Sequence, residues 1–327
     1  LRVDWEILSE FALTAQLGRT LEKTGASASF FKRDLLAEVY SHMVPWLKEN
    51  AMERIADNES TFIRYVYGIL QRMRTHGAVD HPFFEMYRKE YLNQYALNWT
   101  FDRRHFLNPY FGGGVHFPKL VGTFHNGRNH ELLDMAVMRG DNKQTWYSNY
   151  FIEVFEDPWI GKNSALFNDF MCKLFDTMVD VGLVTKEVQG GGNYAINPEH
   201  IWISNQVKHI QCDTCQSRLC VAVQDQLAEN THCLDYKCKG TYSEETKPEL
   251  NYYQQVYNRK FSPRVHAHEH TGLLERRDRE ELEKDFKQHP HSNSINVLSA
   301  TSTLEMGIDI GDLNVMGNTN VPPKPSN

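Results

Sequence analysis

Residues 296–313 read NVLSATSTLEMGIDIGDL, and this stretch decides more about the fold than any other part of the chain. An apolar strand signal is followed by small and hydroxyl side chains, then by Gly307 and Asp309, before Gly311 breaks the pattern. Small residues let backbone N–H groups approach a phosphate, and a fixed carboxylate can accept a hydrogen bond from a ribose hydroxyl. The pattern therefore predicts a strand that ends in a loop of small residues. An ordinary buried strand followed by a turn is the alternative.

A second informative series lies just upstream. His270, Thr271 and Gly272 come before a predicted helix in which Leu274, Leu282 and Phe286 share an apolar face. The other positions of this helix are mostly charged and are expected to be solvated. They are Glu275, Arg276, Arg277, Asp278, Glu280, Glu281, Glu283, Lys284 and Asp285.

Together the two series resemble superfamily 2 helicases, in which a similar HG, Arg and Phe series precedes motif V of the second RecA-like lobe. The stretch around Gly307 resembles motif V itself, the loop that faces both nucleic acid and ATP. The resemblance implies that Gly307 and Asp309 lie near ATP. It also implies a nucleic-acid side formed by His270, Thr271, Gly272, Ser299 and Thr301. Met306 departs from the arginine that many DEAD-box relatives carry before the motif V glycine, so any contact made by that arginine is in doubt.

Other helicase motifs are missing from the sequence. It contains no G-x-x-x-x-G-K-[ST] loop and no DEAD or DEAH tetrapeptide to hold magnesium. The glycines at 112–114 are followed by Val115, His116 and Phe117, which predicts a flexible loop and not a phosphate site. The sequence also stops before an arginine-bearing motif VI. We therefore expect the middle of a larger protein, which uses ATP and Mg²⁺ only when intact.

The composition is that of an ordinary globular chain. Its 327 residues, 41% hydrophobic and 24% charged, are enough for two or three compact units. No apolar run is long enough to span a bilayer and no secretory signal is present, so we expect a cytoplasmic protein without a membrane partner. The net charge of −7 does not by itself favour nucleic acid, although helicases bind phosphates through local contacts.

The cysteines suggest a metal site. Cys212-x-x-Cys215 and Cys233-x4-Cys238 form two short knuckles, each set among turn-forming residues. Four thiolates in this arrangement suit a closed, tetrahedral Zn²⁺ site with a structural role. A pair of disulfides is the alternative, which an intracellular setting disfavours. Nearby His209 and His232 could each replace a cysteine, but we expect both at the surface.

A winged-helix-like unit is predicted over residues 159–205. Ser164 can cap a helix with apolar side chains at helical spacing, and Gly182 ends it. Two strands around the glycines at 190–192 then form a hairpin. Because Lys173 is the only cation on a helix that carries three aspartates, packing is favoured over base reading.

Residues 1–158 are expected to form a mainly helical insertion. One helix over 34–56 is predicted to be kinked or divided at Pro45. Another over 60–76 could begin a degenerate winged helix spanning 60–95. Its basic side chains are candidates for DNA contact, with a solvated helix face as the equal alternative; they include Arg64, Arg72 and Arg74.

The whole order adds a four-cysteine module over 206–250 and part of the second RecA-like lobe over 251–327. This order resembles large bacterial superfamily 2 helicases with an MrfA-like zinc module, as in the Druantia and DISARM anti-phage systems. Glu10 and residues 18–22 are similar to the opening of the same insertion. The implied fold is α/β plus α+β.

Two functional hypotheses follow. The resemblance implies an ATP-dependent DNA helicase or translocase of a bacterial defence or repair system. Its partners would be single- or double-stranded DNA, the remainder of the helicase chain and other defence-system subunits. The competing hypothesis is a zinc-stabilised winged-helix adaptor without ATPase activity, which binds nucleic acid or protein. It leaves residues 299–312 unexplained.

Overall fold

The structure, a computed structural model, describes residues 20–82, 118–124, 133–140, 143–186, 193–246, 252–257, 265–288 and 294–300, with some shorter stretches and single positions. The chain divides into two compact units, Leu1–Gln255 and Val256–Asn327. Among the described residues no helix is both long enough and apolar enough to cross a membrane.

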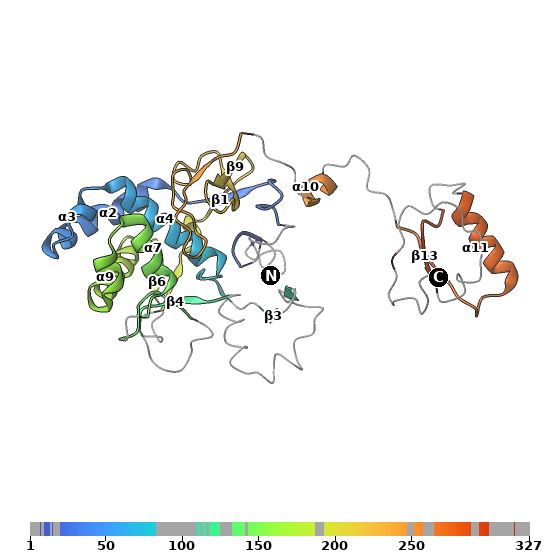
Figure 1. The fold of residues 1–327 in the computed structure, drawn as a ribbon, viewed down its shortest axis with the longest axis horizontal. Helices are drawn as coiled ribbons and strands as arrows, with labels where there is room; N and C mark the ends of the chain where they lie inside the picture. Colours follow the sequence, from blue (N-terminus) through green and yellow to red (C-terminus); the bar gives the residue numbers. More distant parts are fainter. Residues whose placement is uncertain are drawn as a thin grey trace. The chain divides into compact units, whose positions relative to one another are not determined.

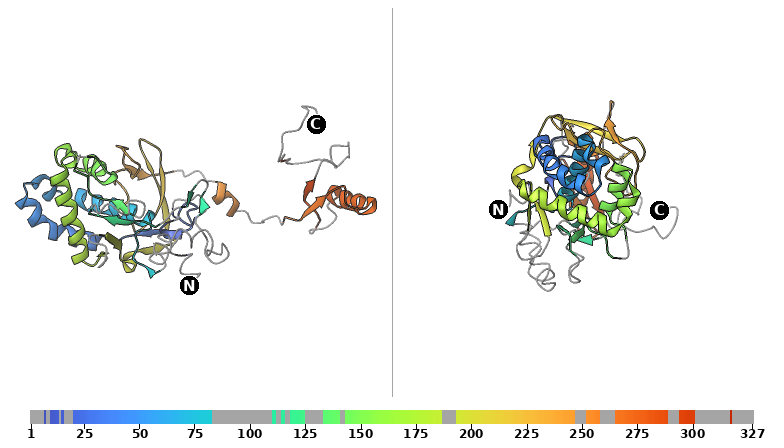
Figure 2. Two further views of the ribbon diagram at one scale, coloured as in Figure 1. Left: turned by 90° about the horizontal axis from the view of Figure 1, so that it is seen from below. Right: turned by 90° about the vertical axis from the view of Figure 1, so that its left-hand side faces the viewer.

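Helices packed side by side form the core of the first unit (Figures 1 and 2). The long helices are α2 (Arg33–Glu49), α4 (Glu59–Thr75), α7 (Trp146–Phe155) and α9 (Ser164–Asp180), and the short ones are α3 (Glu53–Ala56) and α8 (Pro158–Lys162). Helix α4 is buried on most sides, as expected of a central helix. The Tyr65 ring on α4 stacks on Tyr150 of α7 with centroids 5.6 Å apart. A side chain at Gly68 would overlap Tyr150, so glycine permits this close approach.

Two details of these helices differ from the sequence predictions. Helix α2 runs through Pro45 and ends at Glu49, and the chain turns at Ala51, whose φ is 55°. The proline removes one backbone hydrogen bond, but burial of the helix side chains on either side keeps α2 continuous. At the start of α9, the cap is Asn163 and not Ser164. Its Oδ1 accepts hydrogen bonds from the backbone N–H groups of Ala165 and Leu166 at 3.0 and 3.2 Å.

A four-stranded sheet has the order β5-β4-β7-β6. Its strands are β4 (Leu120–Gly122), β5 (Leu133–Met135), β6 (Val184–Lys186) and β7 (Asn193–Ile196). Strands β6 and β7 form an antiparallel hairpin after α9, which agrees with the order of elements expected for a winged helix. On α9, Asp176 holds the hairpin by accepting hydrogen bonds from Lys186 Nζ at 2.9 Å and Tyr194 OH at 3.0 Å. Because β4 and β5 extend the same sheet, the winged-helix interpretation stays a prediction.

Shorter strands complete the first unit. β8 (Trp202–Ser204) pairs with β1 (Ala28–Phe30), and β2 (Tyr110–Phe111) pairs with β3 (Gly114–Val115), both antiparallel. A 3-10 turn, η1 (Pro198–His200), precedes β8. A three-stranded antiparallel sheet of order β10-β9-β11 is formed by β9 (Val207–Cys212), β10 (Arg218–Ala222) and β11 (Tyr242–Glu244). Helix α10 (Tyr252–Tyr257) follows this sheet in the chain.

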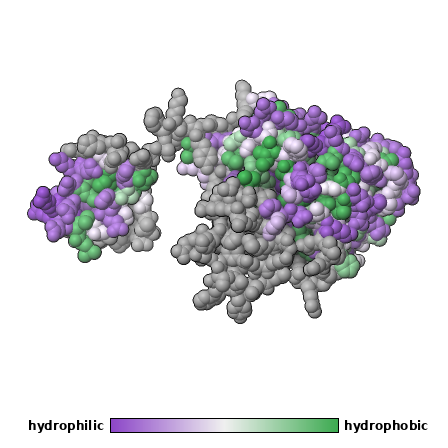
Figure 3. All heavy atoms as spheres, turned by 180° about the vertical axis from the view of Figure 1, so that it is seen from behind, coloured by the Kyte–Doolittle hydropathy of each residue, from purple (hydrophilic) through white to green (hydrophobic). Residues whose placement is uncertain are grey.

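The surface in Figure 3 is largely hydrophilic, with hydrophobic residues gathered in patches on the first unit. Exposed large apolar side chains of this unit include Trp202, Ile203 and Val223. The Lys32 ammonium lies 3.6 Å from the centroid of the Trp202 ring, so this ring already has a cationic partner. Some exposed apolar surface is normal on a folded protein.

The described part of the second unit is a strand–helix–strand arrangement. Strands β12 (Ala267–His270) and β13 (Val297–Ala300) are parallel, with Ala267 opposite Val297 and His270 opposite Ala300. Helix α11 (Arg276–Gln288) connects them, and Leu282 is its buried apolar residue. Parallel strands joined through a helix are typical of α/β lobes. The mixed α/β content expected for this part of the chain is therefore confirmed.

Candidate functional site

Four cysteines come together at one end of the β10-β9-β11 sheet. Cys212 ends β9 and Cys215 lies in the turn after it, while Cys233 and Cys238 belong to the loop before β11. Their four sulfur atoms lie within 4.8 Å of one another. The Sγ atoms of Cys212 and Cys238 are 3.7 Å apart, and those of Cys215 and Cys233 are 3.5 Å apart. Tetrahedral zinc with Zn–S bonds of about 2.3 Å requires sulfur atoms about 3.8 Å apart, so the cluster fits this ion.

Backbone groups and a glycine shape the first knuckle around Cys212. The Thr214 N–H donates to Cys212 Sγ at 3.4 Å. Burial raises the pKa of Cys212, but hydrogen bonds from backbone N–H groups and neighbouring thiols outweigh burial and lower it, whereas burial raises the pKa of Cys215 to about 11 and also raises that of Cys233. A thiolate is the form that binds metal. A side chain at Gly240 would overlap Asp213 and Cys212 Sγ, so only glycine lets the second knuckle close against the first.

The histidines next to the cluster are not among its four ligands. His232 is half-buried beside Cys233, and its Nδ1 is buried without a hydrogen-bond partner. His209 is half-buried in β9, and its Nε2 lies 3.4 Å from Gln254 Nε2. Both side chains are thus less exposed than the sequence predicted. Neither replaces a cysteine within the described residues. Of the two remaining cysteines, Cys172 is half-buried and packs against the core, and Cys220 lies in β10.

The second knuckle docks directly on helix α7. The indole N–H of Trp146 donates to the carbonyl of Leu234 at 3.0 Å, and Asn149 Nδ2 lies 3.5 Å from the hydroxyl of Tyr236. Because Leu234 and Tyr236 lie between Cys233 and Cys238, both contacts depend on the shape of this cysteine loop. The cluster is therefore part of the interface between the cysteine module and the helical core.

A second set of contacts joins the same module to helix α4. Arg64 donates from Nε to the carbonyl of Glu229 at 3.1 Å, and the hydroxyl of Tyr67 donates to Asp225 Oδ2 at 2.7 Å. Tyr67 and Asp225 are both buried. Buried polar groups of this kind fix one docking geometry, because each would be left unsatisfied in any other.

Asp225 predicts a measurable pH dependence. Burial raises its pKa to about 6, although hydrogen bonds from Tyr67 and from the N–H groups of Leu227 and Ala228 oppose the rise. Since the folded-state pKa lies above the unfolded value, the folded protein binds more protons than the unfolded chain between about pH 4 and 6. The free energy of unfolding therefore falls as the pH rises through 6. Asp225→Asn removes the charge and keeps an acceptor. When the pH rises from 5 to 7.5, the free energy of unfolding of the wild type, measured with urea, should fall by about 1 kcal/mol relative to that of this variant. A difference that does not change with pH would contradict the prediction.

The basic face expected on helix 60–76 is different in the structure. Arg74 is 5% exposed and pairs with Glu22, which is 7% exposed, at 2.9 Å. Arg72 donates two hydrogen bonds to Asp134, from Nε at 2.7 Å and from Nη2 at 3.0 Å. The prediction of a free cationic face is therefore wrong for Arg72 and Arg74. Their carboxylate partners come from distant parts of the chain, which the helix pattern could not show.

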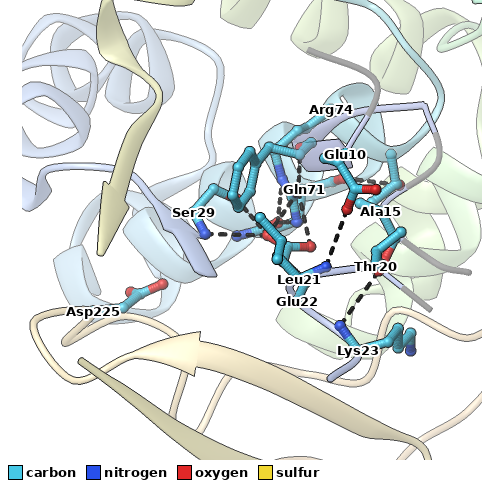
Figure 4. Close-up of polar contacts among 12 residues, drawn as sticks. Glu10, Ala15, Thr20, Leu21, Glu22, Lys23, Ser29, Gln71, Arg74 and Asp225 are labelled. Atoms are coloured by element: carbon cyan, nitrogen blue, oxygen red, sulfur yellow. Dashed lines mark hydrogen bonds and ion pairs between the residues drawn. The ribbon is translucent and has the colours of Figure 1, made fainter. Parts of the chain in front are cut away.

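The opening segment is fixed by two glutamates, as Figure 4 shows. Glu10 Oε2 accepts a hydrogen bond from the backbone N–H of Leu21 at 3.0 Å. Glu22 accepts from the N–H and the hydroxyl of Ser29 at 3.1 and 2.6 Å, and from Arg74 of α4. These are residues of the opening stretch for which the sequence showed a resemblance. In the structure they join the segment before β1 to the central helix.

In the second unit, His270 is fully buried and its Nε2 lies 2.9 Å from Glu283 Oε1 on α11. The expectation that Glu283 is simply solvated is therefore wrong, because its carboxylate contacts His270 of β12. Thr271 is half-buried, while Gly272 and Ser299 are exposed. Thr301, Gly307 and Asp309 lie outside the described residues, so their expected roles stay predictions.

Several residues that organise the sites were not predicted. They are Trp146, Asp134, Tyr67 and Asp225. Each makes its contact with a residue far away in the sequence, and none belongs to a local motif. The spacing of the cysteines, by contrast, is a local signal, and it did identify the cluster.

Comparisons with known proteins identify the C-terminal part of the chain. Residues 239–327 match the helicase conserved C-terminal domain family. No curated protein matches the chain, and no solved structure matches it. The match includes β12, α11 and β13, so the strand–helix–strand arrangement is part of a RecA-like helicase lobe.

Proposed function

We propose that this chain is the central part of an ATP-dependent DNA helicase or translocase that serves bacterial anti-phage defence or DNA repair. The observation that carries the proposal is the match of residues 239–327 to a helicase C-terminal domain, together with the parallel β12–β13 pair that α11 connects. ATP and Mg²⁺ would be held jointly with another part of the intact protein. The subunits of a defence system are further candidate partners.

Within this lobe the residues would have separate roles. Gly307 and Asp309 are proposed near ATP, and Thr301 and Ser299 near the nucleic-acid backbone. Thr271 and Gly272 directly follow β12, and the His270–Glu283 contact can fix the point where this strand ends. We therefore assign His270 a positioning role for the neighbouring nucleic-acid loop.

The preceding module would shape the path of the DNA. Zinc would be held by Cys212, Cys215, Cys233 and Cys238, and its role there is structural, since four thiolates leave no open coordination position. The hydrogen bonds of Trp146 and Tyr67 would hold the cysteine module in a fixed position on the helical core. The proposed insertion is thus a rigid guide for DNA.

A substitution in the motif V stretch tests the proposal. Asp309→Ala in the full-length protein should lower the rate of ATP hydrolysis at least about tenfold, equivalent to roughly 1.4 kcal/mol. Asp312→Ala, a few residues further along the same stretch, is the matched control and should retain most of the activity. Equal rates for both variants and the wild type would remove the support for the assignment of Asp309.

The adaptor hypothesis remains the second candidate, because the cysteine module and the helical core form a compact unit of their own. It predicts nucleic-acid or protein binding without any ATP turnover by the intact protein. It gives no account of the helicase C-terminal match.

A further inference from the structure

A cavity of about 460 Å³ opens in the first unit. It is bordered by the end of α4, the segment before β1, strand β10 and the second cysteine knuckle. Ligand sites in proteins commonly have volumes of roughly 300–1,000 Å³ and combine apolar surface with a few charged groups. This cavity has both kinds of lining, which include Lys23, Glu22, Arg72, Trp146 and Tyr236. It is thus large enough for one nucleotide.

Tyr236 is the exposed aromatic ring of the lining. It is 57% exposed, whereas Trp146, Tyr67 and Tyr242 are each at most 9% exposed. Trp146 already stacks on Tyr150 with centroids 4.6 Å apart. Tyr236 keeps a surface available, although the Lys237 ammonium lies 5.0 Å from its ring centroid.

The position of Tyr236 is fixed before any ligand arrives. It lies between two cysteines of the cluster, and its hydroxyl lies 3.5 Å from Asn149 Nδ2 of α7. The next residue, Lys237, has a φ of 60°, so the chain turns sharply at this point. A ring held in this way loses little conformational entropy when a flat ligand stacks on it.

Lys23 supplies a positive charge to the same cavity. Its Nζ donates to the carbonyl of Arg218 at 3.4 Å. Burial lowers the pKa of Lys23, although the charges of Glu22 and Asp235 oppose this. Lys23 lines the cavity, so an anionic group of a ligand bound there would lie close to a positive charge. The nearby guanidinium groups of Arg72 and Arg74 already have carboxylate partners.

We infer that this cavity holds one unpaired nucleotide of a single-stranded nucleic acid, with the base stacked on Tyr236 and the phosphate beside Lys23. Every base offers a flat face, so the contact would tolerate any sequence. A duplex keeps its bases stacked inside and cannot offer one to the ring without opening. The inference rests on the proposed function and adds that the guide prefers single strands.

The test measures binding of the zinc-loaded full-length protein to a fluorescein-labelled single-stranded DNA by anisotropy. Tyr236→Ala should weaken binding about 5- to 100-fold, the usual loss for one base stacked on an aromatic ring. Tyr236→Phe retains the ring and should bind like the wild type. Tyr252→Ala removes another exposed tyrosine, 70% exposed on α10, and should also bind like the wild type.

A second variant, on a different segment, tests the phosphate contact. Lys23→Gln should reduce the slope of log K against log salt by about 0.7, as expected for one lost contact to single-stranded DNA. A merely structural role for Lys23 would leave this slope unchanged. The salt dependence of Lys23→Gln also tests the inference if Tyr236→Ala loses zinc or has a lowered melting temperature.

The outcomes separate this inference from the proposed function. If the wild type shows DNA-stimulated ATP hydrolysis but Tyr236→Ala binds single strands as tightly as the wild type, the cavity assignment is wrong and the helicase proposal stands. An unchanged salt slope for Lys23→Gln overturns the phosphate contact. If the wild type binds no DNA at all, both proposals fall.

Discussion

Replacing Arg74 by methionine is expected to destabilise the first unit by about 3–5 kcal/mol, the usual effect of breaking a buried ion pair. Arg74 donates to Glu22, to the carbonyl of Phe11, and from Nε and Nη2 to Gln71 Oε1 at 3.0 and 2.7 Å. The substitution leaves the Glu22 carboxylate buried and without its cation. Chemical denaturation followed by circular dichroism measures the loss.

Two controls give this result its meaning. Arg54→Met makes the same change at an ion pair with Glu156 in which both side chains are mostly exposed, and it should cost less than about 1 kcal/mol. In the double variant Glu22→Gln, Arg74→Met, no uncompensated charge remains, so part of the stability should return. If Arg74→Met is no more harmful than Arg54→Met, the buried pair does not fix the opening segment.

Loss of the proposed zinc site is expected to have the second large effect. Cys233→Ser is expected to abolish stoichiometric zinc binding and to loosen the cysteine module from α7, because Trp146 and Asn149 contact the loop that Cys233 begins. Zinc content by mass spectrometry, the melting temperature and protease cleavage within residues 206–246 measure the change. A chelator should produce the same cleavage in the wild type.

The matched control is Cys172→Ser, a cysteine of α9 outside the cluster. It should keep one zinc per four-cysteine group and remain protected from proteolysis. A Cys233→Ser protein that retains both zinc and its melting temperature would contradict the cluster assignment. Loss of zinc in Cys172→Ser as well would show that the measurement reports general damage.

What the sequence predicted depended on local patterns. The knuckles of Cys212 and Cys233 could be identified because the ligands within each knuckle are only a few residues apart and turn formers surround them. Helix α9 was predicted from its apolar spacing, and the hairpin β6–β7 from the strands around a glycine run. The motif near Gly307 identified a helicase lobe, which the match of residues 239–327 supports.

What the sequence could not show depended on contacts between distant residues. The helix pattern alone predicts that Arg74 is a solvated cation. In the structure it pairs with Glu22, which lies far away in the sequence. The sequence predicted that His270 binds nucleic acid, but in the structure its side chain is buried and contacts Glu283. The helix is not divided at Pro45, one of the two outcomes expected there, because tertiary packing outweighed a local propensity. Charge and helix breakers are thus weak signals wherever packing supplies a partner.

The most direct test of the central claim is ATP hydrolysis by the full-length protein, measured with and without single- and double-stranded DNA. We expect DNA to stimulate ATP hydrolysis, because nucleic acid and ATP would both bind to the lobe that contains residues 239–327. DNA binding without any turnover would contradict it and would favour a zinc-stabilised adaptor.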